Sequence, residues 1–382
     1  MIPLVSVYMV LVVFTDFSCR AGPHLHFLHP NTAGRAVQKE EPMPPPLPII
    51  LYLVYIFLFK MWYTVLEYSC MLLCSYQALA EAFGRKGRLM KFVRYVEKVP
   101  GAQPVLGLLS QNETSVHPLS SLLCREMRTM QQLIVSLKEE ELPLLAKASQ
   151  GDGIPLSQVN VLAPIDRPLH DILCVGVNYR DHREETKTDL PTEGAVHHAV
   201  YFGKRAHFIL GDGEPIPARL DLDSQLDYEV ELAVIIGKEG RDISPEQAEG
   251  YIFGYSVFND LSSRTIQKQH SQWLRGKSLD GYTAMGPCIL HKSALPFPVE
   301  VDVCSLVNGE VRQSSNTRLL LTSLPQIIAD LSQGMTLEPG DIIATGTPGG
   351  VGLGFDPPRF LKKGDKVECR IPPIGSLCNT VE

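Results

Sequence analysis

The stretch Asp227–Gly237 reads DYEVELAVIIG, and its pattern decides how this part of the chain folds. It is rich in β-branched residues and ends at a glycine, which predicts a β-strand. Successive side chains of a strand point to opposite faces. One face therefore carries four aliphatic side chains, those of Val230, Leu232, Val234 and Ile236. The other face carries two carboxylates and two apolar side chains, those of Glu229, Glu231, Ala233 and Ile235.

Two carboxylates on one face of an otherwise apolar strand are energetically costly. The charges of Glu229 and Glu231 repel each other, and burial removes the water that stabilises both. A divalent cation relieves this cost, because hard cations bind carboxylate oxygens and Mg²⁺ needs few of them from the protein. The strand alone leaves two interpretations open: a metal site, or a solvated edge strand with two surface glutamates.

The composition is that of an ordinary globular protein. The 382 residues allow about two domains, and 45% of them are hydrophobic. A net charge of −7, without a basic stripe among aromatic residues, argues against nucleic-acid binding. The nine cysteines include no CxxC pair and do not form the pattern of a disulfide framework or a zinc ribbon. Cys174 and Cys304 lie in apolar runs, as is typical of buried thiols in a reducing compartment.

Residues 1–87 differ from the rest of the chain. Their start is apolar, but it lacks the basic region of a secretory signal and the Arg- and Ser-rich character of a mitochondrial transit peptide. The apolar run Ile49–Phe59 is shorter than the roughly 20 residues of a membrane span. A longer segment, 47–74, includes Lys60 and Glu67, which each cost about 2.5–3.5 kcal/mol at a membrane centre. We therefore favour a leader that packs poorly and lies outside the working enzyme over a membrane segment at 47–74.

Two further segments follow this leader. Residues 88–162 combine strand-like runs with the helical periodicity of Leu119–Ala148, and predict a small N-terminal α+β subdomain. Residues 163–382 contain many short strands with frequent turn signals and few helices. This pattern predicts a mainly β fold with α excursions (α+β), a roll or sandwich, and excludes a doubly wound parallel sheet. The predicted strands of the second segment are Ile172–Val177, Val200–Gly203, Tyr228–Gly237, Tyr251–Asn259, Val299–Val307, Asp341–Thr345 and Lys366–Ile371, and the predicted helices are Asp181–Thr186, Pro245–Gly250, Ser263–His270 and Leu324–Ser332.

A third carboxylate lies at a predicted strand-to-helix corner. Asp260 follows the strand Tyr251–Asn259 and precedes a short helical pattern. From this corner it can close a three-carboxylate site with Glu229 and Glu231. The alternative is that Asp260 only caps the helix that follows.

Polar residues downstream of this corner can bind an anion. Arg264 and Lys277 can each bind a carboxylate, and arginine offers a two-pronged fork for it. Gln267 lies between them, although each of the three taken alone is more often a surface residue. The glycine-rich stretch Thr345–Gly352 follows a predicted strand and permits close backbone approach to a small anion. It has no Lys-Ser/Thr partner, so a P-loop is excluded, and no GxSxG elbow is present in the chain.

His182 and Glu185 lie three residues apart in a predicted helical turn, and therefore on one face of it. A carboxylate in that position can orient an imidazole or a water molecule for proton transfer. The spacing alone allows a surface pair equally well.

In this order, these elements make residues 163–382 resemble the C-terminal domain of the fumarylacetoacetate hydrolase family, and most of all its domain-containing protein 2 branch. Residues 88–162 fit the small N-terminal extension of that branch, and residues 1–87 match nothing there. The matched elements are Gly176-x-Asn178-Tyr179-x-x-His182-x-x-Glu185, Phe202-Gly203-Lys204, Asp227-Tyr228-Glu229-x-Glu231, Asn259-Asp260-x-x-x-Arg264-x-x-Gln267, Gly276-Lys277-Ser278, Val307-Asn308-Gly309-Glu310 and Gly340-Asp341-Ile342-Ile343-x-Thr345-Gly346-Thr347-Pro348.

The resemblance implies a fold, a cofactor and roles for these residues. It implies a mixed β-sandwich roll, usually a homodimer, with Mg²⁺ or Mn²⁺ bound through Glu229, Glu231 and Asp260. It also implies a binding site for a small 2-oxo acid. The catalytic residues that it implies are Lys277, His182 and Glu185. The substrate-binding residues that it implies are Arg264, Gln267, Thr347 and Lys204. Two residues depart from the family pattern: Thr265 stands where an acidic residue is common, and Cys378 where a basic residue is common. Neither is an implied metal ligand, so the departures bear on the identity of the substrate more than on metal binding.

The resemblance leaves several chemistries open. The branch implies oxaloacetate keto–enol tautomerisation, and the wider family implies hydrolysis of a carbon–carbon bond in acylpyruvates or fumarylacetoacetate. Decarboxylation of oxaloacetate is a third outcome of the same enolate chemistry. A mitochondrial location follows from the resemblance, with the cytoplasm as the alternative. A different class, a catalytically silent or membrane-anchored binding protein, would not need the complete set of metal and anion residues.

Overall fold

The computed structural model describes residues 89–186 and 198–382. The predicted leader 1–87, including the candidate membrane segment 47–74, lies outside the described residues. In the part that is described, no helix is long and apolar enough to cross a membrane.

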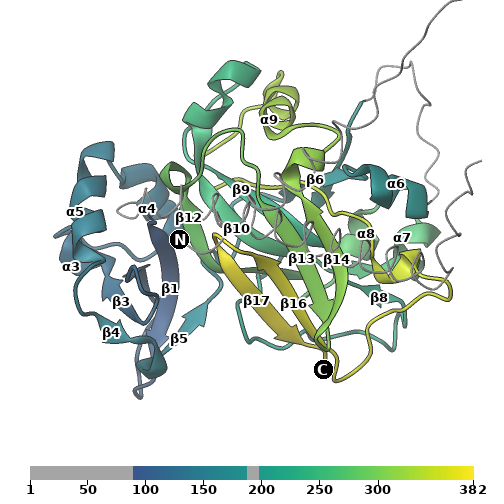
Figure 1. Ribbon diagram of the computed structural model, residues 1–382, viewed down its shortest axis with the longest axis horizontal. Coiled ribbons are helices and arrows are strands. Elements are labelled where there is room, and N and C mark those ends of the chain that lie inside the picture. Colours follow the sequence, from purple (N-terminus) through teal and green to yellow (C-terminus); the bar gives the residue numbers. More distant parts are fainter. Residues whose placement is uncertain (1–88, 187–197) are drawn as a thin grey trace, which may run out of the picture. The chain divides into compact units, whose positions relative to one another are not determined.

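Two β-sheets dominate the described chain (Figure 1). The large sheet has 11 strands in the order β4-β3-β2-β1-β12-β10-β9-β15-β6-β7, with β5 paired to β1. Its strands are β1 (Lys91–Glu97), β2 (Val105–Leu109), β3 (Ser115–Pro118), β4 (Ile154–Pro155), β5 (Val159–Leu162), β6 (Ile172–Gly176), β7 (Val200–Lys204), β9 (Val230–Ile236), β10 (Ile252–Asp260), β12 (Thr283–His291) and β15 (Ile342–Ala344). It is a mixed sheet, because β15 runs parallel to β6 and antiparallel to β9.

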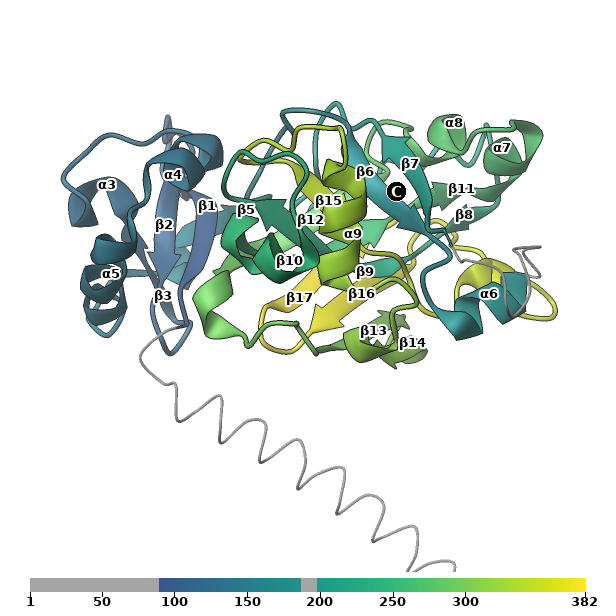
Figure 2. The same ribbon diagram turned by 90° about the horizontal axis from the view of Figure 1, so that it is seen from above.

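The second sheet has four strands in the order β14-β13-β16-β17. These are β13 (Asp302–Val307), β14 (Glu310–Asn316), β16 (Lys366–Ile371) and β17 (Gly375–Thr380), and a short pair is formed by β8 (Leu226–Asp227) and β11 (Ser262–Ser263). Figures 1 and 2 show this sheet against one face of the large one, and a single apolar cluster joins residues of both. The predicted mainly β sandwich with α excursions is confirmed.

Helices cover the edges and the remaining faces of the sheets. They are α3 (Leu119–Leu122), α4 (Met130–Ser136), α5 (Leu142–Ala148), α6 (Arg180–Thr186), α7 (Arg264–Gln269), α8 (Leu274–Lys277) and α9 (Leu324–Ser332), with 3₁₀ turns η1 (Glu139–Glu141), η2 (Leu156–Gln158), η3 (Pro245–Tyr251), η4 (Lys292–Ala294), η5 (Thr317–Leu319) and η6 (Gly352–Gly354). The predicted helical stretch Leu119–Ala148 is divided into three helices. One reason is local: Thr129 and Gln132 form a capping box that begins α4.

Strand β9 is central in the large sheet. It lies between β10 and β15, and all seven of its residues are buried. Its side chains alternate as predicted, because Val230 and Leu232 join the cluster between the sheets, whereas Ala233 and Ile235 join the cluster on the opposite face. The alternative of a solvated edge strand is therefore wrong, and the carboxylates beside this strand are buried in the interior.

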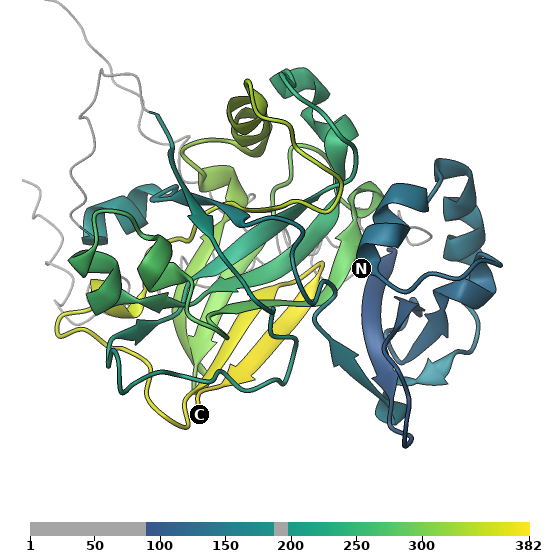
Figure 3. The ribbon, with the colours of Figure 1, turned by 180° about the vertical axis from the view of Figure 1, so that it is seen from behind.

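Strand β12 was not predicted. It contains Pro287, and proline removes a hydrogen-bond donor from a sheet. The pairing of β10 with β12 shifts register between Tyr255 and Val257, and Val257 pairs with Gly286. Pro287 therefore lies next to an irregularity, where a strand tolerates it. On its other side β12 pairs with β1, so the large sheet continues into the N-terminal segment (Figure 3).

This continuity predicts that the N-terminal segment unfolds together with the rest. Phe92 on β1 is fully buried and stacks on Phe253 of β10, with ring centroids 5.6 Å apart. Phe92→Ala should lower the free energy of unfolding by about 3–5 kcal/mol in one cooperative transition, measured with urea. Val99→Ala, at an exposed position, should change it by less than about 0.5 kcal/mol. A separate early transition confined to the N-terminal segment would contradict the prediction.

Candidate metal centre

Three carboxylates meet where β9 begins and β10 ends. The strands are antiparallel, with Asn259 opposite Val230, so Glu229 and Asp260 emerge at the same end of the pair. The backbone N–H of Asp260 donates to the carbonyl of Glu229 at 2.9 Å. One oxygen from each of Glu229, Glu231 and Asp260 lies within 4.8 Å of the others, and all three residues are buried. The predicted convergence of these carboxylates is confirmed.

The electrostatics of this cluster fit a divalent cation. Burial and the neighbouring carboxylates of Asp260 and Glu229 raise the pKa of Glu231 well above its ordinary value. Burial alone would also raise the pKa of Glu229, but nearby cations, Lys277 first among them, lower it to about 2. A cation among the three groups would favour the ionised form of all of them, and three oxygen donors suit Mg²⁺ or Mn²⁺.

Lys277, the last residue of α8, bridges two of the three carboxylates. Its Nζ lies 2.7 Å from Glu229 Oε2 and 2.7 Å from Asp260 Oδ2, and its side chain is buried. Burial alone would lower the pKa of Lys277, but the two carboxylates outweigh that effect and raise it. The side chain therefore remains an ammonium ion at neutral pH, next to the candidate metal ligands.

Lys204, at the end of β7, contacts the same aspartate from the other side. Its Nζ lies 2.6 Å from Asp260 Oδ1 and donates to the carbonyl of Leu261 at 3.0 Å. Lys204 is fully buried, and burial lowers its pKa despite the contact with Asp260. Both oxygens of Asp260 are thus held by lysines, and this position of Lys204 favours a role in orienting Asp260 over direct contact with a substrate.

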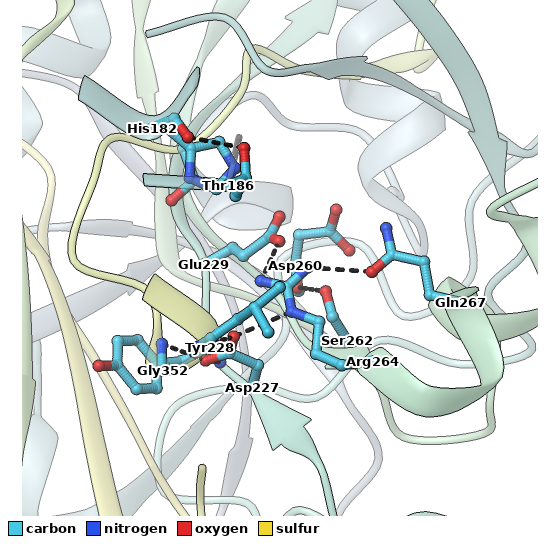
Figure 4. A network of polar contacts seen from close by, with 12 residues as sticks. His182, Thr186, Asp227, Tyr228, Glu229, Asp260, Ser262, Arg264, Gln267 and Gly352 are labelled. Carbon is cyan, nitrogen blue, oxygen red and sulfur yellow. Dashed lines mark hydrogen bonds and ion pairs between the residues drawn. The ribbon is translucent and has the colours of Figure 1, made fainter. Parts of the chain in front are cut away.

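Arg264 begins α7 and connects a candidate ligand to a second buried aspartate (Figure 4). Its Nη2 lies 2.7 Å from Glu229 Oε1, and its Nε donates to Asp227 Oδ2 at 2.9 Å. A third guanidinium nitrogen, Nη1, donates to the half-buried Gln267 at 3.1 Å. Asp227 also accepts from the backbone N–H groups of Gly352 and Leu353. It belongs to the stretch with which the sequence analysis began, but was not predicted to be a site residue.

His182 and Glu185 pair on α6, with His182 Nδ1 2.7 Å from Glu185 Oε1. The other oxygen of Glu185 accepts from the backbone N–H of Gly350 at 2.8 Å, which ties α6 to the glycine-rich loop. Figure 4 shows His182 on the same side of the site as Glu229, and His182 is among the groups that lower the pKa of Glu229. The pair therefore faces the carboxylate cluster and is not a surface pair.

The loop Thr345–Gly352 contacts the third candidate ligand through its backbone. The N–H of Gly346 donates to Glu231 Oε2 at 2.7 Å. Gly346 has φ +99°, and a Cβ there would come within 2.7 Å of the Cβ of Asn178, so the turn requires glycine. Thr347 Oγ1 donates to the carbonyl of Val230 at 3.0 Å, which fixes the loop against the start of β9.

Two buried amides support this loop, and the sequence analysis did not predict either as a site residue. Gln313 on β14 donates to Thr347 Oγ1 at 2.7 Å and accepts from the backbone N–H of Val230 at 3.1 Å. Asn178, before α6, donates to the carbonyls of Thr345 and Thr322. Asn178 stands in a matched motif, which was a usable signal. Gln313 is an ordinary polar residue in a strand, and nothing in the pattern around it marks it.

Residues 171–382 match the family model of the fumarylacetoacetate (FAA) hydrolase C-terminal domain. The chain belongs to this family. It is an enzyme of a family whose members include isomerases and hydrolases, and the resemblance inferred from the sequence is confirmed.

Named relatives are similar over more than half of this chain. The chain is 47% identical over 228 residues to oxaloacetate tautomerase YisK of Bacillus subtilis, covering 59% of this chain and 74% of that protein. It is 40% identical over 285 residues to the mitochondrial oxaloacetate tautomerase FAHD2A of Bos taurus, covering 73% of this chain and 88% of that protein. The structure of maleylpyruvate hydrolase from Sphingobium sp. SYK-6, in complex with manganese(II) and pyruvate, is 27% identical with a TM-score of 0.60, covering 76% of this chain and 98% of that one.

Removal of one candidate ligand tests whether the carboxylate cluster binds a cation. Asp260→Asn keeps the size of the side chain but removes a charge, so the affinity for Mg²⁺ and Mn²⁺ should fall by roughly 100-fold or more in a calorimetric titration. Asp280→Asn, at an exposed aspartate near α8, should leave the affinity unchanged. Thermal melts would show that both variants are folded. Equal affinity of Asp260→Asn and the unchanged protein would exclude Asp260 as a ligand.

Proposed function

We propose that the protein is an oxaloacetate keto–enol tautomerase that uses Mg²⁺, with Mn²⁺ as the alternative metal. The single observation that carries the proposal is the buried cluster of Glu229, Glu231 and Asp260, with the ammonium group of Lys277 on two of its members. The two relatives named oxaloacetate tautomerases, at 47% and 40% identity, support the choice of substrate and reaction.

The reaction moves one proton between carbon 3 and the 2-oxo oxygen of oxaloacetate, and breaks no carbon–carbon bond. A divalent cation held by the three carboxylates would supply positive charge for the carboxylate and the 2-oxo oxygen of the substrate. Lys277 is the group of this chain that can stabilise the negative charge that develops on that oxygen, because it is buried and protonated. The imidazole of His182, oriented by Glu185, is placed to hold or move the proton.

The substrate carboxylates need further cationic or polar partners. Arg264 faces the cluster and donates to Gln267, and the half-buried Gln267 lies nearer the solvent than the arginine. We assign Arg264, Gln267 and Thr347 to substrate binding. Because the ammonium of Lys204 is fully buried against Asp260, we assign this lysine to positioning that carboxylate.

We also propose that the working form is a homodimer, as the family resemblance of the sequence implies. We propose a mitochondrial location, which the name of the bovine relative states for that protein. A cytoplasmic location is the alternative, because the relative YisK comes from a bacterium. The bound manganese in the maleylpyruvate hydrolase structure supports a divalent metal in this fold without favouring magnesium over manganese here.

A second reaction, hydrolysis of the carbon–carbon bond of an acylpyruvate, is favoured by one observation. The pair of His182 and Glu185 faces the carboxylate cluster and can activate a water molecule. The similar structure named maleylpyruvate hydrolase is consistent with this reaction. Decarboxylation of oxaloacetate is the third outcome of the same enolate chemistry.

Parallel assays of the full chain distinguish these reactions. With Mg²⁺ or Mn²⁺ present, we expect a faster decay of enol-oxaloacetate, followed by ultraviolet absorbance, than in the metal-only control. Pyruvate release from oxaloacetate and cleavage of an acylpyruvate should stay at the rates of that control. Pyruvate release as the fastest process would identify a decarboxylase, and acylpyruvate cleavage a hydrolase. Either of these results would contradict the proposed tautomerase.

A variant of Lys277 tests its assigned role. Lys277→Ala should lower kcat by roughly 10²–10⁴-fold, because the charge that opposes the developing oxyanion is lost. The protein should still bind the divalent metal, because none of the three carboxylates is removed. Lys268→Ala, at an exposed lysine of the neighbouring α7, is the matched control and should leave kcat unchanged. An unchanged kcat in Lys277→Ala would exclude the lysine from the reaction.

A further inference from the structure

A cavity lies at the opposite end of the β9–β10 pair from the carboxylates. Its volume is about 150 Å³, and residues of α4, η1, α5, the ends of β9 and β10, and η4 line it. Gly237, just after β9, and Ile252, the first residue of β10, both belong to the lining. Gly237 is the sixth residue after Glu231, so the cavity is roughly 20 Å from the carboxylate cluster. We call it the distal cavity.

One wall of the distal cavity is apolar, and the space beside it is about the size of one six-membered ring. Ile134 and Leu142 come from the N-terminal segment, and Phe253 comes from β10. A protein cavity of about 150 Å³ lined by aliphatic and aromatic side chains can hold a molecule of the size of benzene. The space therefore has room for one apolar group of the size of a ring.

Lysines at the rim give the cavity a positive charge. Lys138, Lys238 and Lys292 line it, against a single carboxylate, that of Glu139. Among the described residues, neither Lys238 nor Lys292 is within ion-pair distance of a carboxylate. Lys238 lies over the ring of Tyr251, with its Nζ 5.1 Å from the ring centroid, and Lys292 donates to the carbonyl of Glu249. Two ammonium groups at this rim are thus available to an anion.

His291 supplies a directional donor in the wall. It is 7% exposed, and its ring packs edge-on against Phe92 and Phe253. Its Nδ1 accepts from the backbone N–H of Ser293, and burial lowers the pKa of His291 to about 4. The ring is therefore neutral. Its Nδ1 also lies 2.9 Å from Ser293 Oγ, and with Nδ1 as the acceptor for Ser293 the proton of the ring is assigned to Nε2. This N–H has no hydrogen-bond partner among the described residues, so it is free to donate to a ligand.

We propose that the distal cavity binds a small monocarboxylate with a ring-sized apolar body. The apolar ring of the ligand packs against the apolar wall of the cavity. The carboxylate of the ligand accepts a hydrogen bond from His291 and faces Lys238 and Lys292. A monoanion fits better than a phosphate monoester, because the lining contains no arginine and one glutamate, Glu139. The N-terminal segment supplies part of this wall and β9 and β10 supply the rest, so the ligand would stabilise the contact between them.

Benzoate is the probe that tests this site. Calorimetry on the full chain, with Mg²⁺ and saturating pyruvate to occupy the carboxylate centre, should show benzoate binding with a Kd on the order of 1 mM. Benzamide, which has the same shape without the charge, should bind at least roughly tenfold more weakly. No benzoate binding under these conditions would overturn the proposal, and so would equal affinity for benzamide. A failure of the proposed tautomerase activity would leave this result unaffected, because the site is a separate one.

Variants at the rim and in the wall locate the bound benzoate. Lys238→Met combined with Lys292→Met should weaken benzoate binding at least roughly tenfold, while Lys363→Met, an exposed lysine elsewhere, should not change it. Leu142→Trp, which reduces the volume of the cavity, should abolish binding with little change in melting temperature. Unchanged affinity in both the double lysine variant and Leu142→Trp would show that benzoate binds elsewhere and would overturn the proposal.

Discussion

The carboxylate of Asp260 is held between two buried ammonium groups, and the rest of the site depends on this arrangement. Lys204 lies 2.6 Å from one of its oxygens and Lys277 lies 2.7 Å from the other. A charge that is removed from water must be compensated by close partners, or it is lost by protonation. The strands and helices around Asp260 therefore do more than bury apolar surface: they bring β7, α8 and the end of β10 to one point.

The same requirement explains the surroundings of the two glutamates. Glu229 lies among cations and keeps a low pKa, whereas Glu231 lies beside two carboxylates with one backbone donor and has a raised pKa. Two acids of the same type thus differ in protonation because their neighbours differ. A bound cation would favour the ionised form of both glutamates and would thereby reduce the difference between their pKa values.

The polypeptide around the cluster is held rigid by backbone contacts to buried polar side chains. Asp227 accepts from the turn η6, Glu185 accepts from Gly350, and Gln313 connects Thr347 to the start of β9. Each of these side chains contacts the glycine-rich loop or the turn that follows it. The contact of Glu185 therefore connects α6 to the same loop that Asp227 and Gln313 hold in place. The pair of His182 and Glu185 is therefore positioned relative to the carboxylates by the loop as well as by its own helix.

The sequence by itself determined the central strand, the three candidate metal ligands and the family. Alternation along Asp227–Gly237 is a local property, and Asp260 is marked by its place at the end of the next strand. Only the tertiary structure decided which partners compensate the buried charges. Lys204 is 56 residues from Asp260, and Gln313 is 83 residues from Val230, so no local pattern relates them. The tertiary structure also decided that the N-terminal segment extends the large sheet. The pairing of β1 with β12 depends on the order of the strands in the sheet, and the packing of the whole chain sets that order.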